Sequence, residues 1–327
     1  MISVSLFFLF SALYAITKLY KCPNMQFNDF NKDNSTLLGG VLSIMVVLCH
    51  TSSIHSDMRY WGPLIVATFM FRSGYGLMNS YVIQGDTYLN NFFKKRFLKI
   101  LYPLFFITTL HVLLMHYIHG YNIESFCTGL KHGRVPIGAT WYLFTSLFFY
   151  VAFYLSAKYS KSFRKLITLM GAFSMLYFVV IASLGTFWRY WLLPSFIMMA
   201  GMLFYHYEKR LKSFITEYRF QSIVYCLFLV VFCFMCVKVC WLSSFVMYAI
   251  FPIAVIVIIY YVGMPKGKIT MFLGSLSYEI YLIHDCIIAL LLPFKFNHTL
   301  YLFLVFGMTI PLAILLNKLN THVLYKL

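Results

Sequence analysis

The sequence predicts an all-α, polytopic transmembrane helical bundle, and composition is the first reason. Of its 327 residues, 61% are hydrophobic and only 11% are charged, whereas soluble domains carry about 25% charged residues. Apolar runs of about 20 residues recur along the whole chain, and each is long enough to cross a bilayer. A transmembrane β-barrel would instead show alternating segments of about 10 residues. We therefore expect membrane-spanning helices and no soluble domain.

These apolar runs predict eleven spans. They are residues 2–19, 36–54, 62–82, 98–118, 139–157, 166–185, 190–207, 220–240, 242–262, 270–292 and 299–319. The first run lacks a positively charged start and a small-x-small cleavage site, so we expect a retained span rather than a signal peptide. No linker or internal repeat divides the remainder. The expected organisation is an extra N-terminal span with its cytoplasmic loop, residues 1–34, and one ten-span membrane domain, residues 35–327.

The excess of positive charge predicts an orientation in the membrane. The chain carries 26 Lys and Arg against 9 Asp and Glu, a net charge of +17. The basic residues gather in alternate loops, as at Lys94–Lys99 and Lys209–Arg219, and cytoplasmic loops are the ones enriched in Lys and Arg. The pattern predicts the N-terminus outside and the C-terminus inside. It also predicts membrane lipid, and no nucleic acid, as a partner.

His50, in the second span, is the first candidate functional residue. It lies about 14 residues, or roughly 21 Å of helical rise, from the cytoplasmic end of its span. A histidine inside a membrane is costly unless it faces protein or water. His284 lies at the same depth in span ten, about 14 residues from its cytoplasmic end, with Asp285 beside it and Trp141 at a similar depth in span five. A hydrogen bond between helices, without chemistry, is the alternative for either histidine.

Arg72 lies near the middle of span three and needs a partner there. An arginine at that depth costs about 2.5–3.5 kcal/mol on the insertion scale, and Glu279 and Asp285 in span ten are the available acids. The resulting pair would be either structural or catalytic. On span two, Gly39 and Gly40 leave the helix surface bare, so another helix or a ligand could approach closely.

Two spans carry polar side chains at helical spacing. In span ten, Ser277, Tyr281 and His284 stand at i, i+4 and i+7 and share one face. We expect this stripe to face inward. In span four, three histidines approach the outer end, with no carboxylate or cysteine on their face; they are His111, His116 and His119. We expect these to decorate the membrane interface rather than to bind a metal.

Taken in order, five motifs resemble those of the bacterial membrane-bound acyltransferase 3 family. They are Gly39-Gly40-Val41 to His50, Phe69 to Leu77 with Arg72-Ser73-Gly74-Tyr75, Phe93 to Pro103 with Lys94, Lys95, Arg96 and Lys99, Thr140-Trp141-Tyr142-Leu143, and Ser277 to His284. Together they cover residues 35–292, and the extra first span lies outside them. No soluble esterase-like domain, as found in some members, is present in the sequence.

The resemblance implies an O-acyltransferase of the bacterial cytoplasmic membrane. Cytoplasmic acyl-CoA, with acetyl-CoA the first choice, would donate to a hydroxyl of an extracytoplasmic glycan or lipid-linked sugar, without a metal. The implied catalytic residues are His50 as base, Arg72 for negative charge, and His284 and Asp285 for orientation. The implied substrate-binding residues are Ser73, Tyr75, Trp141, Tyr142, Glu279 and Tyr281. Lys94, Lys95, Arg96 and Lys99 would hold the phosphates of CoA.

One departure from the family pattern keeps other functions open. The family has an arginine 11 residues before its histidine, and this chain has Gly39 there. Arg72 on the neighbouring span could replace that cation. Otherwise the chain could be an inactive scaffold relative, or a carrier or flippase for a lipid-linked sugar or small anion. Trp141 could simply anchor at the interface, and the Lys94–Lys99 patch could simply set topology. The sequence does not define the oligomeric state.

Overall fold

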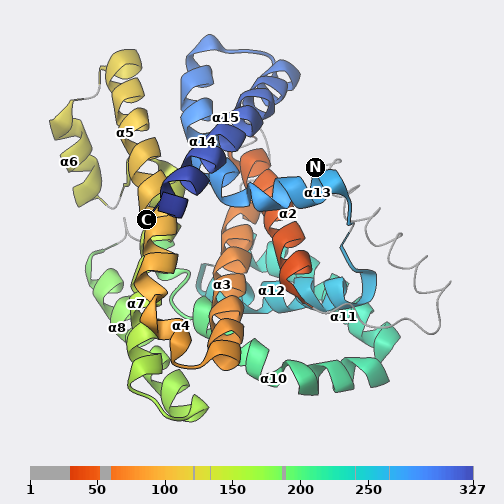
Figure 1. Ribbon diagram of the computed structural model, residues 1–327. Coiled ribbons are helices and arrows are strands. Elements are labelled where there is room, and N and C mark those ends of the chain that lie inside the picture. Colours follow the sequence, from red (N-terminus) through yellow and green to blue (C-terminus); the bar gives the residue numbers. More distant parts are fainter. Residues whose placement is uncertain are drawn as a thin grey trace. The chain divides into compact units, whose positions relative to one another are not determined.

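The protein is helical throughout the part of the chain that the computed structural model describes. That part comprises residues 30–51, 60–120, 122–132, 134–185, 189–239, 241–264 and 266–326, and no strand occurs within it (Figure 1). The expected first span, residues 2–19, lies outside the described residues. The all-α prediction is therefore confirmed for the described ranges.

The helices follow the predicted spans closely. They are α2 Lys32–Thr51, α3 Gly62–Gln84, α4 Thr87–Asn90, α5 Lys99–His119, α6 Ile123–Lys131, α7 Trp141–Lys158, α8 Phe163–Ser183, α9 Arg189–Leu192, α10 Ile197–Glu217, α11 Arg219–Val239, α12 Trp241–Val262, α13 Lys268–Ser275, α14 Ser277–Leu291 and α15 His298–Lys326. Three shorter turns are the π-helix η3 at Lys94–Leu98 and the 3₁₀ turns η4 at Gly138–Thr140 and η6 at Leu292–Phe294. Each predicted span from 36 onward coincides with at least one helix.

Two of the predicted spans are broken rather than continuous. The run 190–207 divides into α9 and α10 around Pro194, which lacks the N–H that a helix interior needs. The run 270–292 divides into α13 and α14 at Leu276, whose φ of −96° and ψ of 3° are not helical. His284 therefore lies only seven residues into α14, roughly 10 Å of rise. The expected equal depth of His50 and His284 in the membrane stays a prediction.

The helices are apolar enough for a membrane protein. Six of the described helices could cross a membrane by length and composition, and a bent pair, Tyr190–Glu217 with Gln221–Cys236, would make a seventh. The six are Lys32–Thr51, Arg96–Ile118, Phe163–Ser183, Phe245–Val262, Ser277–Phe294 and His298–His322. α3 and α7 are not among these six. The count of eleven spans and the orientation remain predictions.

The chain forms two compact units. Unit 1 comprises residues 1–78 and 200–275, and unit 2 comprises residues 79–199 and 276–327. Unit 1 contains α2, α11, α12 and α13 with most of α3 and α10. Unit 2 contains α4 to α9, α14 and α15. The expected boundary between residues 34 and 35 stays a prediction.

Glycines bring backbones together within unit 1. A Cβ added at Gly40 would lie 2.8 Å from the amide nitrogen of Gly274, and one at Gly274 would lie 2.6 Å from the carbonyl oxygen of Thr36. α2 and α13 therefore pack backbone to backbone. α10 approaches α3 in the same way at Gly201, where an added Cβ would lie 3.0 Å from the amide nitrogen of Tyr75. The bare wall expected at Gly40 is confirmed, and its occupant is a helix.

Replacing Gly274 by alanine is expected to destabilise unit 1 by about 1–3 kcal/mol, because an added methyl would overlap a backbone carbonyl that cannot move aside. Thermal unfolding of the purified protein checks this. Gly267→Ala is the matched control, since its Cβ would meet only the Thr270 hydroxyl at 3.6 Å, an ordinary contact. Equal melting temperatures for the two variants would contradict the packing.

In unit 2, α14 packs against α5 and α15 (Figure 1). The hydroxyl of Tyr278 donates to the backbone carbonyl of Ile100 at 2.8 Å, which ties α14 to α5. A second network ties α7, α8 and α9, because the Tyr177 hydroxyl shares a hydrogen bond with Thr145 at 2.9 Å and donates to the carbonyl of Trp191 at 2.9 Å. These bonds fix the helices that carry the candidate residues of unit 2.

Candidate functional site

The predicted polar stripe on α14 is buried. Ser277 is 9% exposed, Tyr281 is 2% exposed and His284 is fully buried. α14 begins at Ser277, so its first turn already carries this face, and Tyr281 on it contacts Tyr142 of α7. The expectation that the stripe faces inward is confirmed within unit 2.

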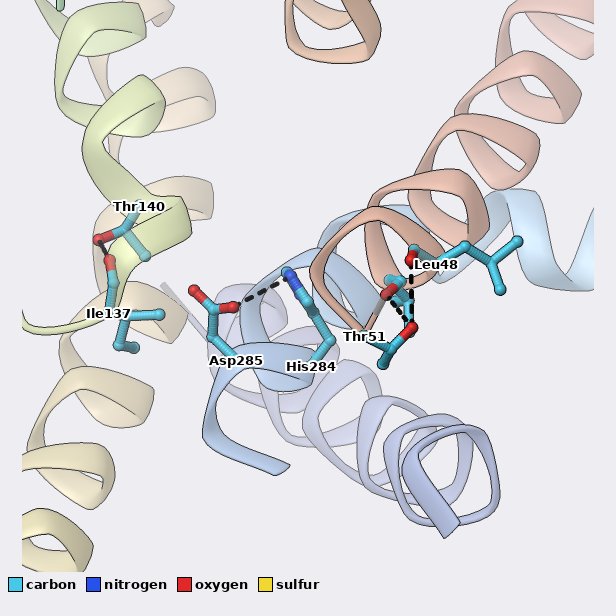
Figure 2. A network of polar contacts seen from close by, with 7 residues as sticks. Leu48, Thr51, Ile137, Thr140, His284 and Asp285 are labelled. Carbon is cyan, nitrogen blue, oxygen red and sulfur yellow. Dashed lines mark hydrogen bonds and ion pairs between the residues drawn. The ribbon is translucent and has the colours of Figure 1, made fainter. Parts of the chain in front are cut away.

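His284 and Asp285 form the polar centre of unit 2. Nε2 of His284 lies 3.4 Å from Oδ1 of Asp285, and Figure 2 shows the carboxylate turned toward the ring. The other carboxylate oxygen, Oδ2, faces Gly138, where an added Cβ would lie at 3.7 Å. Turn η4 holds this segment in place, since the Thr140 hydroxyl donates to the carbonyl of Ile137 at 2.8 Å (Figure 2). A carboxylate beside an imidazole can orient the ring or accept hydrogen bonds from a substrate.

Aromatic rings line the imidazole on one side. The ring centroid of Tyr281 lies 5.7 Å from that of His284, and Tyr142 on α7 packs edge-on against Tyr281 at 4.8 Å. Trp141 is the first residue of α7, and its ring centroid lies 6.3 Å from that of Trp191. Tyr142 and Tyr281 therefore belong to the surroundings of His284, and Trp141 packs against a different residue.

Sequence reasoning missed two buried residues near Asp285. His111 on α5 is only 6% exposed, so the expectation that it decorates the membrane interface is wrong. Tyr301 on α15 is also 6% exposed. The Asp285 carboxylate acts electrostatically on both side chains. The helical spacing of the histidines was visible in the sequence, but it could not tell which face of α5 meets protein and which meets lipid.

In unit 1, the guanidinium of Arg72 lies directly over Gly39. An added Cβ at Gly39 would stand 3.0 Å from Cζ of Arg72 and would overlap Nη1. Nη1 also donates to the backbone carbonyl of Ser35 at 3.0 Å, and the guanidinium lies 5.5 Å from the ring of Phe69. The absence of a side chain at Gly39 is thus what lets an arginine from α3 reach the surface of α2.

His50 occupies the last turn of α2 in unit 1 and is half-buried. One turn and two turns earlier on that face, Val46 and Ser43 are almost fully buried. The Ser43 hydroxyl donates to the carbonyl of Gly40 at 2.8 Å, so it is occupied within its own helix. At the same helix end, the Thr51 hydroxyl donates to the carbonyl of Leu48 at 3.2 Å (Figure 2).

Tyr75 takes part in a cluster that sequence reasoning also missed. Its hydroxyl donates to Oε2 of Glu208 at 2.7 Å, and the hydroxyl of Tyr260 donates to Oε1 at 2.7 Å. Nζ of Lys212, one turn along α10, lies 2.9 Å from the same carboxylate. Three helices of unit 1 thus converge on one carboxylate. Ser73, two residues before Tyr75, is half-buried on α3.

Glu279 is held by amides within unit 2. Its Oε1 accepts hydrogen bonds from Nδ2 of Asn317 at 3.0 Å and of Asn320 at 3.4 Å, and the side chain is 5% exposed. The sequence analysis predicts Glu279 as a partner for Arg72 or as a substrate-binding residue. These hydrogen bonds place it in the contact between α14 and α15.

The basic patch of the η3 turn divides into two kinds of side chain. Lys94 and Lys99 are exposed, whereas Arg96 is half-buried and directs Nε and Nη2 to the Tyr88 hydroxyl at 3.0 and 2.7 Å. The side chain of Lys95 lies outside the described part. Exposed lysines can meet an anion in solution, and Arg96 packs inside unit 2.

Comparison with known proteins gives one family match. A family model described as an acyltransferase domain matches residues 36–318. This range includes every candidate residue in both units. No curated protein and no solved structure matches the chain.

Proposed function

This chain belongs to the acyltransferase 3 family and is a membrane acyltransferase, and from this premise we propose that it is an O-acyltransferase that uses acetyl-CoA from the cytoplasm. The acceptor is a hydroxyl of an extracytoplasmic or lipid-linked glycan, and the membrane is the bacterial cytoplasmic membrane. The observation that carries the proposal is the family match over residues 36–318, which covers the helices that bear His50, Arg72, His284 and Asp285.

In the proposed reaction, the acceptor hydroxyl attacks the thioester carbonyl of acetyl-CoA. His50 accepts the hydroxyl proton as the new C–O bond forms. The carbonyl oxygen becomes an oxyanion, and Arg72 stabilises its charge. The C–S bond then breaks, and CoA leaves as a thiolate that takes up the proton from His50. The acetyl ester of the glycan and free CoA are the products.

The remaining candidate residues would bind and orient the substrates. His284 and Asp285 are proposed to orient the acceptor hydroxyl, and Nε2 of the histidine lies 3.4 Å from Oδ1 of the aspartate. Tyr281, Tyr142 and Trp141 are proposed to lie on the acceptor side. Lys94, Lys95 and Lys99 are proposed to hold the phosphates of CoA, with Arg96 positioning the turn through Tyr88. Glu279, Ser73 and Tyr75 are proposed to support the helices that carry these residues.

Membranes that contain the protein, and membranes that lack it, test this proposal with labelled acetyl-CoA and the host's surface glycans. We expect label in glycan only when the protein is present, and alkali should release it as acetate, because O-acetyl esters are alkali-labile. A carrier would change the distribution of glycan without adding label, and an inactive scaffold would change neither. Absence of label with acetyl-, propionyl- and succinyl-CoA would contradict the proposal.

A further inference from the structure

The carboxylate of Glu208 joins three helices of unit 1 by short bonds. Its Oε2 accepts a hydrogen bond from the Tyr75 hydroxyl of α3, and its Oε1 accepts one from the Tyr260 hydroxyl of α12, each at 2.7 Å. Nζ of Lys212 lies 2.9 Å from Oε1 and 4.7 Å from the centre of the Tyr260 ring. The Glu208 side chain is only 13% exposed. Hydrogen bonds to a charged group are stronger than neutral ones, so this carboxylate holds both tyrosines firmly.

The two tyrosine bonds hold different helices. α10 and α12 are also joined away from Glu208, because the hydroxyl of Tyr261 donates to the carbonyl of Ile215 at 2.6 Å. The Tyr260 bond therefore adds to an existing connection between those two helices. The Tyr75 bond instead connects the carboxylate to α3. Removing one hydroxyl or the other would separate the effect on α3 from the effect on α12.

The same face of α10 packs against one turn of α3, from Phe71 to Tyr75. An added Cβ at Gly201 would overlap the carbonyl oxygen of Phe71 and would lie 3.0 Å from the amide nitrogen of Tyr75. The ring of Phe204 lies 5.4 Å from that of Phe71 and 6.2 Å from that of Tyr75. Gly201, Phe204 and Glu208 stand at i, i+3 and i+7, so they share one helical face. This face holds the turn by its backbone, its rings and its hydroxyl.

Arg72 lies inside this turn and reaches a different neighbour, α2. Its Nη1 donates to the carbonyl of Ser35 at 3.0 Å, and the guanidinium fills the place where a side chain at Gly39 would begin. Because α10 holds the backbone of the turn, a shift of the turn would move the guanidinium over the surface of α2. A misplacement of about 1 Å in a reacting centre can cost about 10²-fold in rate.

We propose that Glu208 is a positioning residue for Arg72. By holding the Tyr75 hydroxyl, it fixes the turn of α3 from which the guanidinium reaches α2. Glu208 acts through α3 and takes no part in the chemistry itself. The inference rests on the proposed function for the effect on acetyl transfer, whereas the placement of Arg72 rests on the contacts within unit 1.

The placement of Arg72 is measurable without any turnover. The full chain in lipid nanodiscs is treated with phenylglyoxal, which modifies accessible guanidinium groups, and peptide mass spectrometry gives the modification rate of Arg72. Glu208→Gln removes the charge, and Tyr75→Phe removes one hydroxyl while keeping the ring. We expect each to raise the rate at least about threefold, because a loosened turn exposes the guanidinium more often. Tyr75→Phe keeps the test valid if Glu208→Gln fails to fold.

Tyr260→Phe is the matched control. It deletes an equally short bond to the same carboxylate, but from α12 instead of α3. We expect Arg72 to be modified within about twofold of the wild-type rate in this variant, because the Tyr75 bond and the packing at Gly201 remain.

Acetyl transfer provides the second measurement. Glu208→Gln and Tyr75→Phe should lower the turnover number at least about tenfold and leave the KM for acetyl-CoA within about twofold, since a misplaced Arg72 is missed only in the transition state. Glu208→Gln should have no further effect in an Arg72→Ala background, because both changes act through one guanidinium. Tyr260→Phe should turn over as the wild type does.

The outcomes separate the positioning role from the proposed function. The positioning role is wrong if Arg72 is modified at the wild-type rate in Glu208→Gln or in Tyr75→Phe. It is also wrong if Tyr260→Phe loosens Arg72 as much as Tyr75→Phe does, or if Glu208→Gln slows the Arg72→Ala variant further. Faster modification of Arg72 as expected, with no acetyl transfer even in the wild type, would overturn the proposed function and leave the placement of Arg72 by Glu208 standing.

Discussion

Replacing His50 by alanine is expected to lower acetyl transfer by about 10²–10⁴-fold, the range that a positioned general base contributes. The side chain is half-buried at the end of α2, where its loss removes little packing. We therefore expect the protein to fold and to bind acetyl-CoA normally. The turnover number should fall while the KM for acetyl-CoA stays within about twofold, which a purely structural role would not produce.

The control for this experiment is His322→Ala, because His322 is an exposed histidine near the end of α15. It should retain full transfer. If His50→Ala retains transfer within about tenfold of the wild type, another group is the base, and His284 is the next histidine to replace. Steady-state kinetics with labelled acetyl-CoA in reconstituted membranes distinguish the two results.

Replacing Arg72 by alanine is expected to lower the turnover number by about 10²–10³-fold, the loss seen when one group that stabilises an oxyanion is removed. Arg164→Ala is the control, since Arg164 is an exposed arginine on α8, and it should leave transfer unchanged. Lysine at position 72 should restore only part of the activity, because a lysine cannot reproduce the planar, multidentate guanidinium.

The packing of Arg72 on Gly39 allows a sharper test. Because the guanidinium occupies the place where a side chain at Gly39 would begin, a double variant, Gly39→Arg with Arg72→Ala, returns a cation to that region from α2. We expect this double variant to recover at least tenfold of the activity lost in Arg72→Ala. Gly39→Arg alone should be destabilised, since two guanidinium groups would compete for one place. A double variant no better than Arg72→Ala would contradict a shared cation position.

The sequence predicted the helices and their faces well, because periodicity and span length both leave clear patterns. The stripe Ser277, Tyr281, His284 is buried as expected, and Gly39 and Gly40 both admit a close neighbour. Helical spacing depends only on 3.6 residues per turn, so it survives even where a span is broken.

The sequence could not predict which polar side chains meet. In a membrane, lipid is as apolar as a protein core, so hydropathy does not separate buried faces from lipid-facing ones. His111 was expected at the membrane interface, whereas its side chain is only 6% exposed. The tyrosine cluster on Glu208 and the amide pair on Glu279 join residues far apart in the chain. The break at Leu276 lies between Ser275 and Ser277 and follows Gly274, but the apolar residues on both sides were read as one span.

The most direct test of the account uses sealed vesicles that contain the purified protein, with surface glycan enclosed and labelled acetyl-CoA outside. We predict alkali-labile label on the enclosed glycan, dependent on His50, in vesicles that stay impermeable to acetyl-CoA. Permeabilised vesicles provide the control for total activity. Label that appears only after permeabilisation, or that is equal with and without His50, would contradict transfer across the membrane by this protein.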